Sequence, residues 1–175
     1  MNSVIERPAA GEFAPYYGKY IEKVEGGDVL PLLVSQIERT WKLLSAVDES
    51  RAGYRYAPGK WSIKQVVGHL SDGERVFAYR ALRFARADVT PLPGFDENQF
   101  AEHGAFDNRP IEDLVLEFRA VRSATIALFA SLSDEALRRR GTANDQPVTV
   151  RALAWIIAGH ELHHRQILIE RYGIS

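Results

Sequence analysis

Three of the five histidines in this chain fall within five positions, in the stretch AGHELHHRQIL (158–168). On a helix, His160 and His164 lie on one face, one turn apart, because four residues separate them. Two imidazoles at this spacing can bind one divalent metal ion, although such pairs also occur as solvated or hydrogen-bonded histidines. His163 is rotated by about 100° from His164, so we do not expect it to share an ion with both neighbours.

The same letters resemble the His-Glu-x-x-His motif of zinc proteases, in which the glutamate is the general base. A metzincin protease needs a glycine three residues and a histidine six residues after the second ligand. This sequence has Ile167 and Glu170 at those positions, which disfavours a protease. Glu161 is therefore expected to be a solvated or salt-bridged carboxylate, with a general-base role as the alternative.

A third ligand has to come from elsewhere in the chain, and His69 is the candidate. Gly68 and Gly159 directly precede His69 and His160. Glycine inside a helix lowers helix stability by about 1 kcal/mol relative to alanine. A glycine beside each histidine therefore indicates close helix packing or room for a ligand. Gly73, one turn beyond His69, could leave space above a metal. Three imidazoles would leave coordination positions open, as in catalytic zinc sites; taken alone, His69 is better explained as a polar residue at the edge of an apolar face.

The composition sets limits on the function. There are no cysteines, 46% of the residues are hydrophobic, and the formal net charge is −1. We therefore expect no disulfide, no thiolate ligand and no basic surface for nucleic acid. The sequence has no apolar run of about 18 residues and no signal-peptide pattern, so we expect no membrane association and a cytoplasmic location.

Four segments have helical periodicity, which predicts an all-α four-helix bundle. The first follows Asp28 as N-cap, and the second begins at Ser62, which can form a capping box with Gln65. The third begins near Pro110 and the fourth follows residues 146–149. No strand pattern competes with these helices.

The connections between the predicted helices are unequal. Residues 88–109 are rich in Pro, Gly, Asp and Asn, and their number favours a long crossover between the second and third helices, or a lid over the site. A short helical turn is expected at residues 133–139. We expect a single domain over residues 1–175, with an aromatic N-terminal arm, about 1–27, packed across the bundle. Tyr16, Tyr17 and Tyr20 in this arm are expected to be packing residues.

Four segments in this order, APYYGKYI (14–21), WSIKQVVGHL (61–70), LPGFDE (92–97) and GHELHHRQIL (159–168), resemble the DinB-like superfamily of metal-binding proteins. The resemblance covers nearly the whole chain, and the histidine segments are its most specific part. It implies an up-down-down-up bundle, a divalent ion (zinc or nickel) bound by His69, His160 and His164, and frequent homodimers. Characterised members include transferases for bacillithiol or related thiols and mycothiol-dependent maleylpyruvate isomerase.

We therefore expect a metal-dependent transferase that activates a low-molecular-weight thiol for a small-molecule substrate. The alternatives are a metal-dependent hydrolase and a non-catalytic metal-binding protein. Asp96 and Glu97 are expected to form a turn, with a carboxylate reaching over the metal as the alternative.

Overall fold

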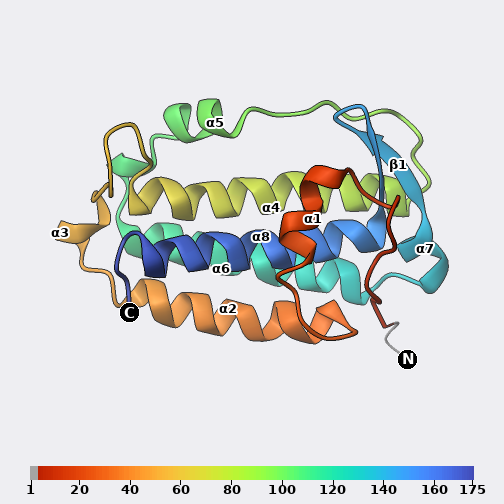
Figure 1. The fold of residues 1–175 in the computed structure, drawn as a ribbon, viewed down its shortest axis with the longest axis horizontal. Helices are drawn as coiled ribbons and strands as arrows, with labels where there is room; N and C mark the ends of the chain where they lie inside the picture. Colours follow the sequence, from red (N-terminus) through yellow and green to blue (C-terminus); the bar gives the residue numbers. More distant parts are fainter. Residues whose placement is uncertain (1–3) are drawn as a thin grey trace.

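Four long helices form the body of the protein in the computed structural model, which describes residues 4–175 (Figure 1). They are α2 (Val29–Ser45), α4 (Ile63–Ala85), α6 (Ile111–Ala130) and α8 (Val150–Glu170). The predicted caps of the first two are confirmed: Asp28 accepts a hydrogen bond from the Leu30 amide, and Ser62 and Gln65 form a capping box. Pro110 is the N-cap of α6 rather than a residue of its first turn.

Helix α8 is enclosed over its first half. It packs against α4 and α2, and α1 (Gly18–Ile21) crosses its outer side (Figure 1). Because neighbours surround it, residues 152–158, which read ALAWIIA, are all buried, whereas α2 has one buried face. This helix carries two of the three candidate ligands, so its environment determines how they are held.

The connection between α4 and α6 runs back along α4 (Figure 1). At the end of α4, Arg83 pairs with Asp88, and at its start the hydroxyl of Ser62 donates to Asp107. Between these points lie α5 (Glu97–His103) and the short 3-10 helix η2 (Phe106–Asn108). The connection therefore covers one side of α4 and, as described below, forms part of the wall of the candidate site.

A small antiparallel hairpin corrects the prediction that no strands occur. Strands β1 (Arg140–Ala143) and β2 (Gln146–Thr149) pair with each other between α7 (Asp134–Arg138) and α8. The two turn residues, Asn144 and Asp145, both have positive φ, 52° and 57°, as a type I′ turn requires. Asparagine and aspartate tolerate this conformation better than most residues, so the Asn-Asp pair was the available signal. The helical turn expected at 133–139 is present as α7.

The N-terminal segment packs closely on the bundle. The 3-10 helix η1 (Pro15–Tyr17) leads into α1, and a Cβ atom on Gly159 would lie only 2.0 Å from the carbonyl oxygen of Tyr20. The indole nitrogen of Trp155 donates to the carbonyl of Ile5 at 3.0 Å. Between α2 and α4 there is one short helix, α3 (Glu49–Ala52). Across residues 4–175, every helix is too short or too polar to cross a membrane.

Candidate metal centre

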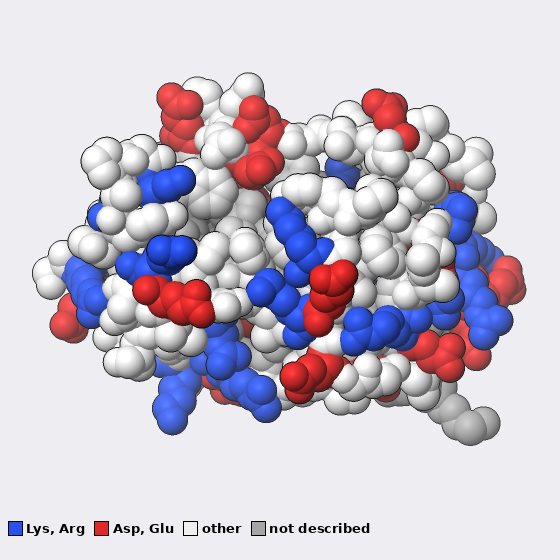
Figure 2. All heavy atoms as spheres, in the orientation of Figure 1, with Lys and Arg blue, Asp and Glu red and all other residues white. Residues whose placement is uncertain are grey.

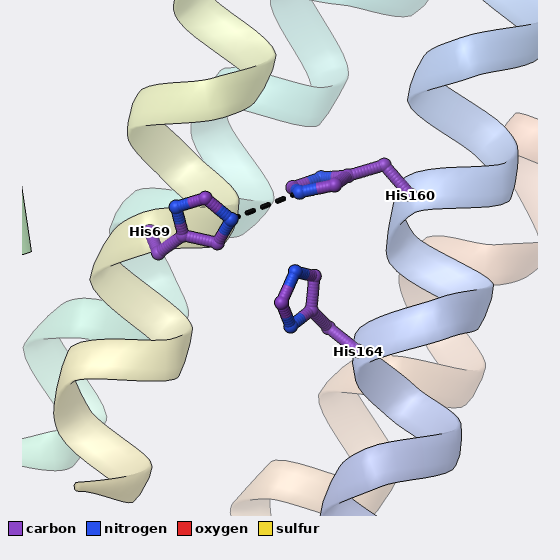
Figure 3. Close-up of side chains that lie close together, drawn as sticks. All are labelled: His69, His160 and His164. Carbon is purple, nitrogen blue, oxygen red and sulfur yellow. Dashed lines mark hydrogen bonds between the residues drawn. The ribbon is translucent and has the colours of Figure 1, made fainter. Parts of the chain in front are cut away.

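The structure brings His69 of α4 together with His160 and His164 of α8 (Figure 3). One ring nitrogen from each of the three histidines lies within 4.8 Å of the others. The Nε2 atoms of His69 and His160 are 2.9 Å apart, which is hydrogen-bond distance. The three rings point into the space between the two helices, and their centroids are 4.6 to 4.8 Å apart.

All three imidazoles are held in the neutral form that a metal ion requires. Each residue is less than one-tenth exposed. Burial lowers the pKa of His69 to about 4 and places the pKa of His160 and His164 well below the ordinary value of 6.5, with further lowering from the neighbouring histidines. At neutral pH the cluster therefore presents unprotonated nitrogen atoms.

Small and aromatic residues position these rings. A Cβ atom on Gly73 would lie 3.2 Å from Cε1 of His160, so the missing side chain gives that ring its place. Trp61, just before α4, lies with its ring 4.7 Å from His69 and is stacked on His164 at 6.4 Å. Tyr20 of α1 makes an edge contact with His160 at 5.4 Å. The ring orientations are thus set by three segments that are distant in sequence.

The donor set fits a divalent metal ion. In a tetrahedral site with Zn–N bonds of about 2.1 Å, two imidazole nitrogens lie about 3.4 Å apart. The observed separations, from 2.9 Å between Nε2 of His69 and Nε2 of His160 to at most 4.8 Å within the cluster, lie on either side of this value, so side-chain rotations that move the nitrogens by about 1 Å would bring all three onto one ion. With no other ligand from residues 4–175 in the cluster, a bound ion would keep open positions toward the cleft.

The centre lies in the wall of a cleft of about 760 Å³, a size typical of small-molecule sites. Its other walls are the N-terminal segment 14–20, the connection around Phe95 and the hairpin turn at Asn144. Tyr17 and Tyr20 line it, and burial raises the pKa of both hydroxyls, so they remain hydrogen-bond donors at neutral pH. Glu97 is the only acidic residue among the described residues that line the cleft.

Glu161 does not face this cleft. It is 1% exposed, pairs with Arg122 of α6 and accepts a hydrogen bond from Thr40 of α2. The salt-bridged alternative from the sequence is therefore correct and the solvated one is wrong. A carboxylate committed to these partners has no free position from which to act as a general base toward the metal centre.

A family model described as the DinB superfamily matches residues 32–168, which include all three clustered histidines. The chain belongs to the DinB superfamily. The segments that carried the resemblance, apart from the first, fall within this match, so the family expected from the sequence is confirmed.

Relatives of this DinB protein extend the comparison. A protein of Oceanobacillus iheyensis, named as a proposed metal-dependent hydrolase, is 24% identical over 82% of this chain and 84% of its own length. The solved structure of YfiT from Bacillus subtilis, described as a proposed metal-dependent hydrolase with an unusual four-helix-bundle topology, superposes with a TM-score of 0.69 at 19% identity, over 97% of this chain and 95% of YfiT. A mycothiol-dependent maleylpyruvate isomerase superposes with a TM-score of 0.66 at 16% identity, over 78% of this chain and 58% of the isomerase. At these identities, the two solved structures establish a shared fold.

Not every site residue of this DinB chain was expected from its sequence. His163 is outside the cluster, as predicted, and lies at the rim of the cleft against Tyr20 at 5.4 Å. Asp96 caps α5 by accepting hydrogen bonds from two amides, which is the turn role expected of it. Trp61 and Arg80 were missed as cleft residues, and the three tyrosines, expected to pack, also line the cleft.

Proposed function

We propose that this DinB protein is a metal-dependent enzyme in which His69, His160 and His164 hold a divalent ion that activates a low-molecular-weight thiol for transfer to a small substrate. One observation carries the proposal: three buried, neutral imidazoles from two helices meet at the wall of an open cleft. A structural zinc site would be closed by a fourth protein ligand, and no such ligand is present among residues 4–175.

A divalent ion with open coordination positions lowers the pKa of a thiol or water molecule that binds to it. Zinc and nickel are the proposed ions, because imidazole nitrogen is a good ligand for both. The protein's own residues supply the rest of the site. Trp61 and Tyr20 hold the imidazole rings, and Tyr17, Phe77 and Phe95 give the cleft aromatic walls against which a substrate would lie.

The residues around the centre favour thiol transfer over hydrolysis. Hydrolases of the thermolysin type use a carboxylate as general base beside the metal. Here Glu161 is buried in an ion pair, and the one acidic residue that lines the cleft, Glu97, is exposed. A thiol whose pKa such an ion lowered would lose its proton to water at neutral pH, and the thiolate is the nucleophilic form, so transfer would not need a protein base.

Hydrolysis is the second candidate, and the names of two relatives favour it. The Oceanobacillus protein and YfiT are both described as proposed metal-dependent hydrolases. The isomerase that shares the fold is named for its dependence on mycothiol, which supports the thiol proposal. The two candidates share one metal centre and differ in the nucleophile.

Product identity separates the candidates. Protein purified without an affinity tag would be depleted of metal, reloaded with Zn²⁺ or Ni²⁺, and assayed with a thiol plus an electrophile and, separately, with esters and amides. We expect a thioether product that requires the metal and increases with pH as the thiol ionises. Hydrolysis products alone would favour the second candidate, and turnover of neither substrate class by metal-loaded protein would favour a non-catalytic metal-binding protein.

We also propose a homodimer, as the family resemblance implied. Light scattering on the eluting peak of a size-exclusion column tests this directly, with a mass near twice 19.7 kDa expected.

A further inference from the structure

Arg80 of α4 is a buried cation at the cleft. The residue is 3% exposed, yet it contributes to the lining of the cleft. One guanidinium nitrogen, Nη2, donates to the carbonyl oxygen of Pro93 at 2.8 Å. The guanidinium also lies 5.9 Å from the ring centroids of both Phe77 and Phe95, so an aromatic ring from α4 and one from the connection hold it in place.

Among residues 4–175, this guanidinium has no carboxylate partner: none of the ion pairs formed there includes Arg80. The other deeply buried arginine, Arg122, pairs with both Glu74 and Glu161. Burying a charge without a counter-charge is costly, and the Pro93 carbonyl, the Tyr17 hydroxyl and two aromatic rings still leave several of the five N–H donors of Arg80 without a partner. A buried arginine with free N–H donors can bind an anion that enters from the cleft.

The position of Arg80 relative to the metal centre suits a small molecule that reaches both. Gly73, against which His160 packs, and Arg80 are seven residues apart on α4, which places them on one face about 10 Å apart along the axis. Phe77 lies between them on the helix, with its ring 6.0 Å from the ring of His160 and 5.9 Å from the guanidinium of Arg80. A ligand lying along Phe77 would therefore have one end at the imidazoles and the other at the guanidinium.

The other charges around the cleft are exposed. Lys19 lies at the mouth with its ammonium 3.8 Å from the Tyr16 ring centroid, and Glu97 is the one lining carboxylate. Figure 2 shows one face of the molecule, with acidic side chains over α5 at its upper edge and basic side chains interspersed with acidic ones across its middle. Exposed charges are screened by water and salt, whereas a buried one is screened much less. Among the charged side chains that line the cleft, Arg80 therefore contributes most to the potential felt by a group that enters it.

We propose that Arg80 is a substrate-binding residue that binds a carboxylate of the small molecule whose reacting group lies at the three-histidine centre. The placement of the reacting group at the histidines rests on the proposed function. The binding of a carboxylate by Arg80 rests only on the residues that line the cleft. A planar guanidinium offers two parallel N–H groups to a planar carboxylate. A carboxylate fits this site better than a phosphate, because the site has one buried cation flanked by apolar rings.

Binding of phenylacetate and of its neutral analogue phenylacetamide tests the proposal. The two probes share an aromatic ring that suits the cleft and differ in charge, so their affinity ratio reports the anion site. The ratio would be measured by calorimetry for the wild type, Arg80→Met and Lys19→Met at matched metal content, because a metal ion could itself bind phenylacetate. We expect the wild type to prefer phenylacetate at least about tenfold, Arg80→Met to lose the preference, and Lys19→Met to keep most of it.

Three outcomes would overturn the proposal: equal binding of the two probes by the wild type, no binding of either at millimolar concentration, or an undiminished preference in Arg80→Met. Circular dichroism and thermal unfolding would establish that each variant is folded. If Arg80→Met is not, Arg80→Lys takes its place and should weaken the preference, because an ammonium lacks the paired N–H geometry. Metal titration on the same samples separates the two proposals, since loss of metal binding with an intact carboxylate preference would reject only the metal centre.

Discussion

At the level of single residues, the side chains of the three clustered histidines point toward one another, and that of His163 does not. His69, His160 and His164 face one another, whereas His163 lies at the rim. His160→Ala should weaken metal binding by at least about 100-fold. Replacing a residue that only hydrogen-bonds to a metal ligand already lowers metal affinity by about 10- to 100-fold, and His160 is itself a candidate ligand. A competition titration with a chromophoric chelator would measure this, with His163→Ala as the matched control that retains affinity. Wild-type affinity in His160→Ala would reject the ligand assignment.

Gly73 allows a second prediction at this scale. In Gly73→Ala the new methyl group would lie 3.2 Å from His160 Cε1, so the ring must move from its present position. We expect metal affinity to decrease about tenfold, while the helix itself gains up to about 1 kcal/mol of stability from alanine. Gly53→Ala is the control, since a Cβ atom there meets nothing within 4 Å. Equal metal affinity in both variants would show that His160 does not depend on this space.

His160 and His164 could be proposed as a pair from their spacing of four residues, whereas His69 was chosen as the third ligand because of the family resemblance. Trp61 and Arg80 have no such signal. An arginine near the end of an amphipathic helix is normally solvated, and Arg80 is buried because the connection brings Phe95 and Pro93 over it. Side chains whose surroundings come from a distant segment could not be identified from local pattern.

At the level of helices, a buried ion network joins the four long helices behind the metal centre. Arg122 of α6 donates to Glu74 of α4 at 2.8 Å and pairs with Glu161 of α8, and Gln36 of α2 donates to the Ala158 carbonyl at 3.0 Å. Glu161 directly follows the candidate ligand His160. The network therefore fixes the rotation of α8, and with it the direction of the imidazoles.

Arg122→Met should be severely destabilising, since it leaves two buried carboxylates without their counter-charge. We expect a loss of about 3–5 kcal/mol in the free energy of unfolding, measured by urea denaturation of the metal-free protein. Arg119→Met is the matched control on the same helix: its partner is Glu38, its side chain is 42% exposed, and a loss below about 1 kcal/mol is expected. Similar losses in the two variants would mean that the buried network contributes no more than a surface pair.

The long helices and their caps were predictable because periodicity and capping residues act within one or two turns. The hairpin was not, because each strand has four residues and its pairing depends on the Asn144-Asp145 turn. Its place is fixed by tertiary contacts: Leu92 bridges to Ala143, and a Cβ atom on Gly141 would lie 2.1 Å from the ring of Phe84. The N-terminal segment was likewise recognised as packed, but its position in the cleft wall depends on the contact between Tyr20 and Gly159.

At the level of the whole molecule, Glu12 ties the N-terminal segment to the start of α8. Its carboxylate accepts hydrogen bonds from Arg151 Nε and from the Thr149 hydroxyl, both at 2.8 Å. The hydrogen bond from Arg151 lowers the pKa of Glu12 from 4.5 to about 2, against the opposing effect of burial. The stabilisation is therefore complete above pH 4.5 and is lost as the pH falls toward 2.

Glu12→Gln should remove this dependence. We expect the variant to lose about 1–2 kcal/mol at neutral pH, and its difference from the wild type to shrink as the pH is lowered from about 4.5 toward 2. Chemical denaturation at a series of pH values measures both effects. A difference that stays constant across this range would show that the Glu12 carboxylate is not stabilised by Arg151 in the folded protein.

The contact of Trp61 with two of the imidazoles has a practical consequence. Of the three tryptophans, Trp155 is fully buried in the core and Trp41 is partly exposed on α2, and neither is among the aromatic contacts of the histidines. Indole emission is sensitive to the charge and spin of its surroundings, and only Trp61 has its ring 4.7 Å from a candidate ligand. The protein therefore contains its own optical sensor: with Trp61→Phe as the blank, quenching of tryptophan fluorescence by Ni²⁺ would follow the filling of the centre in real time, without a label.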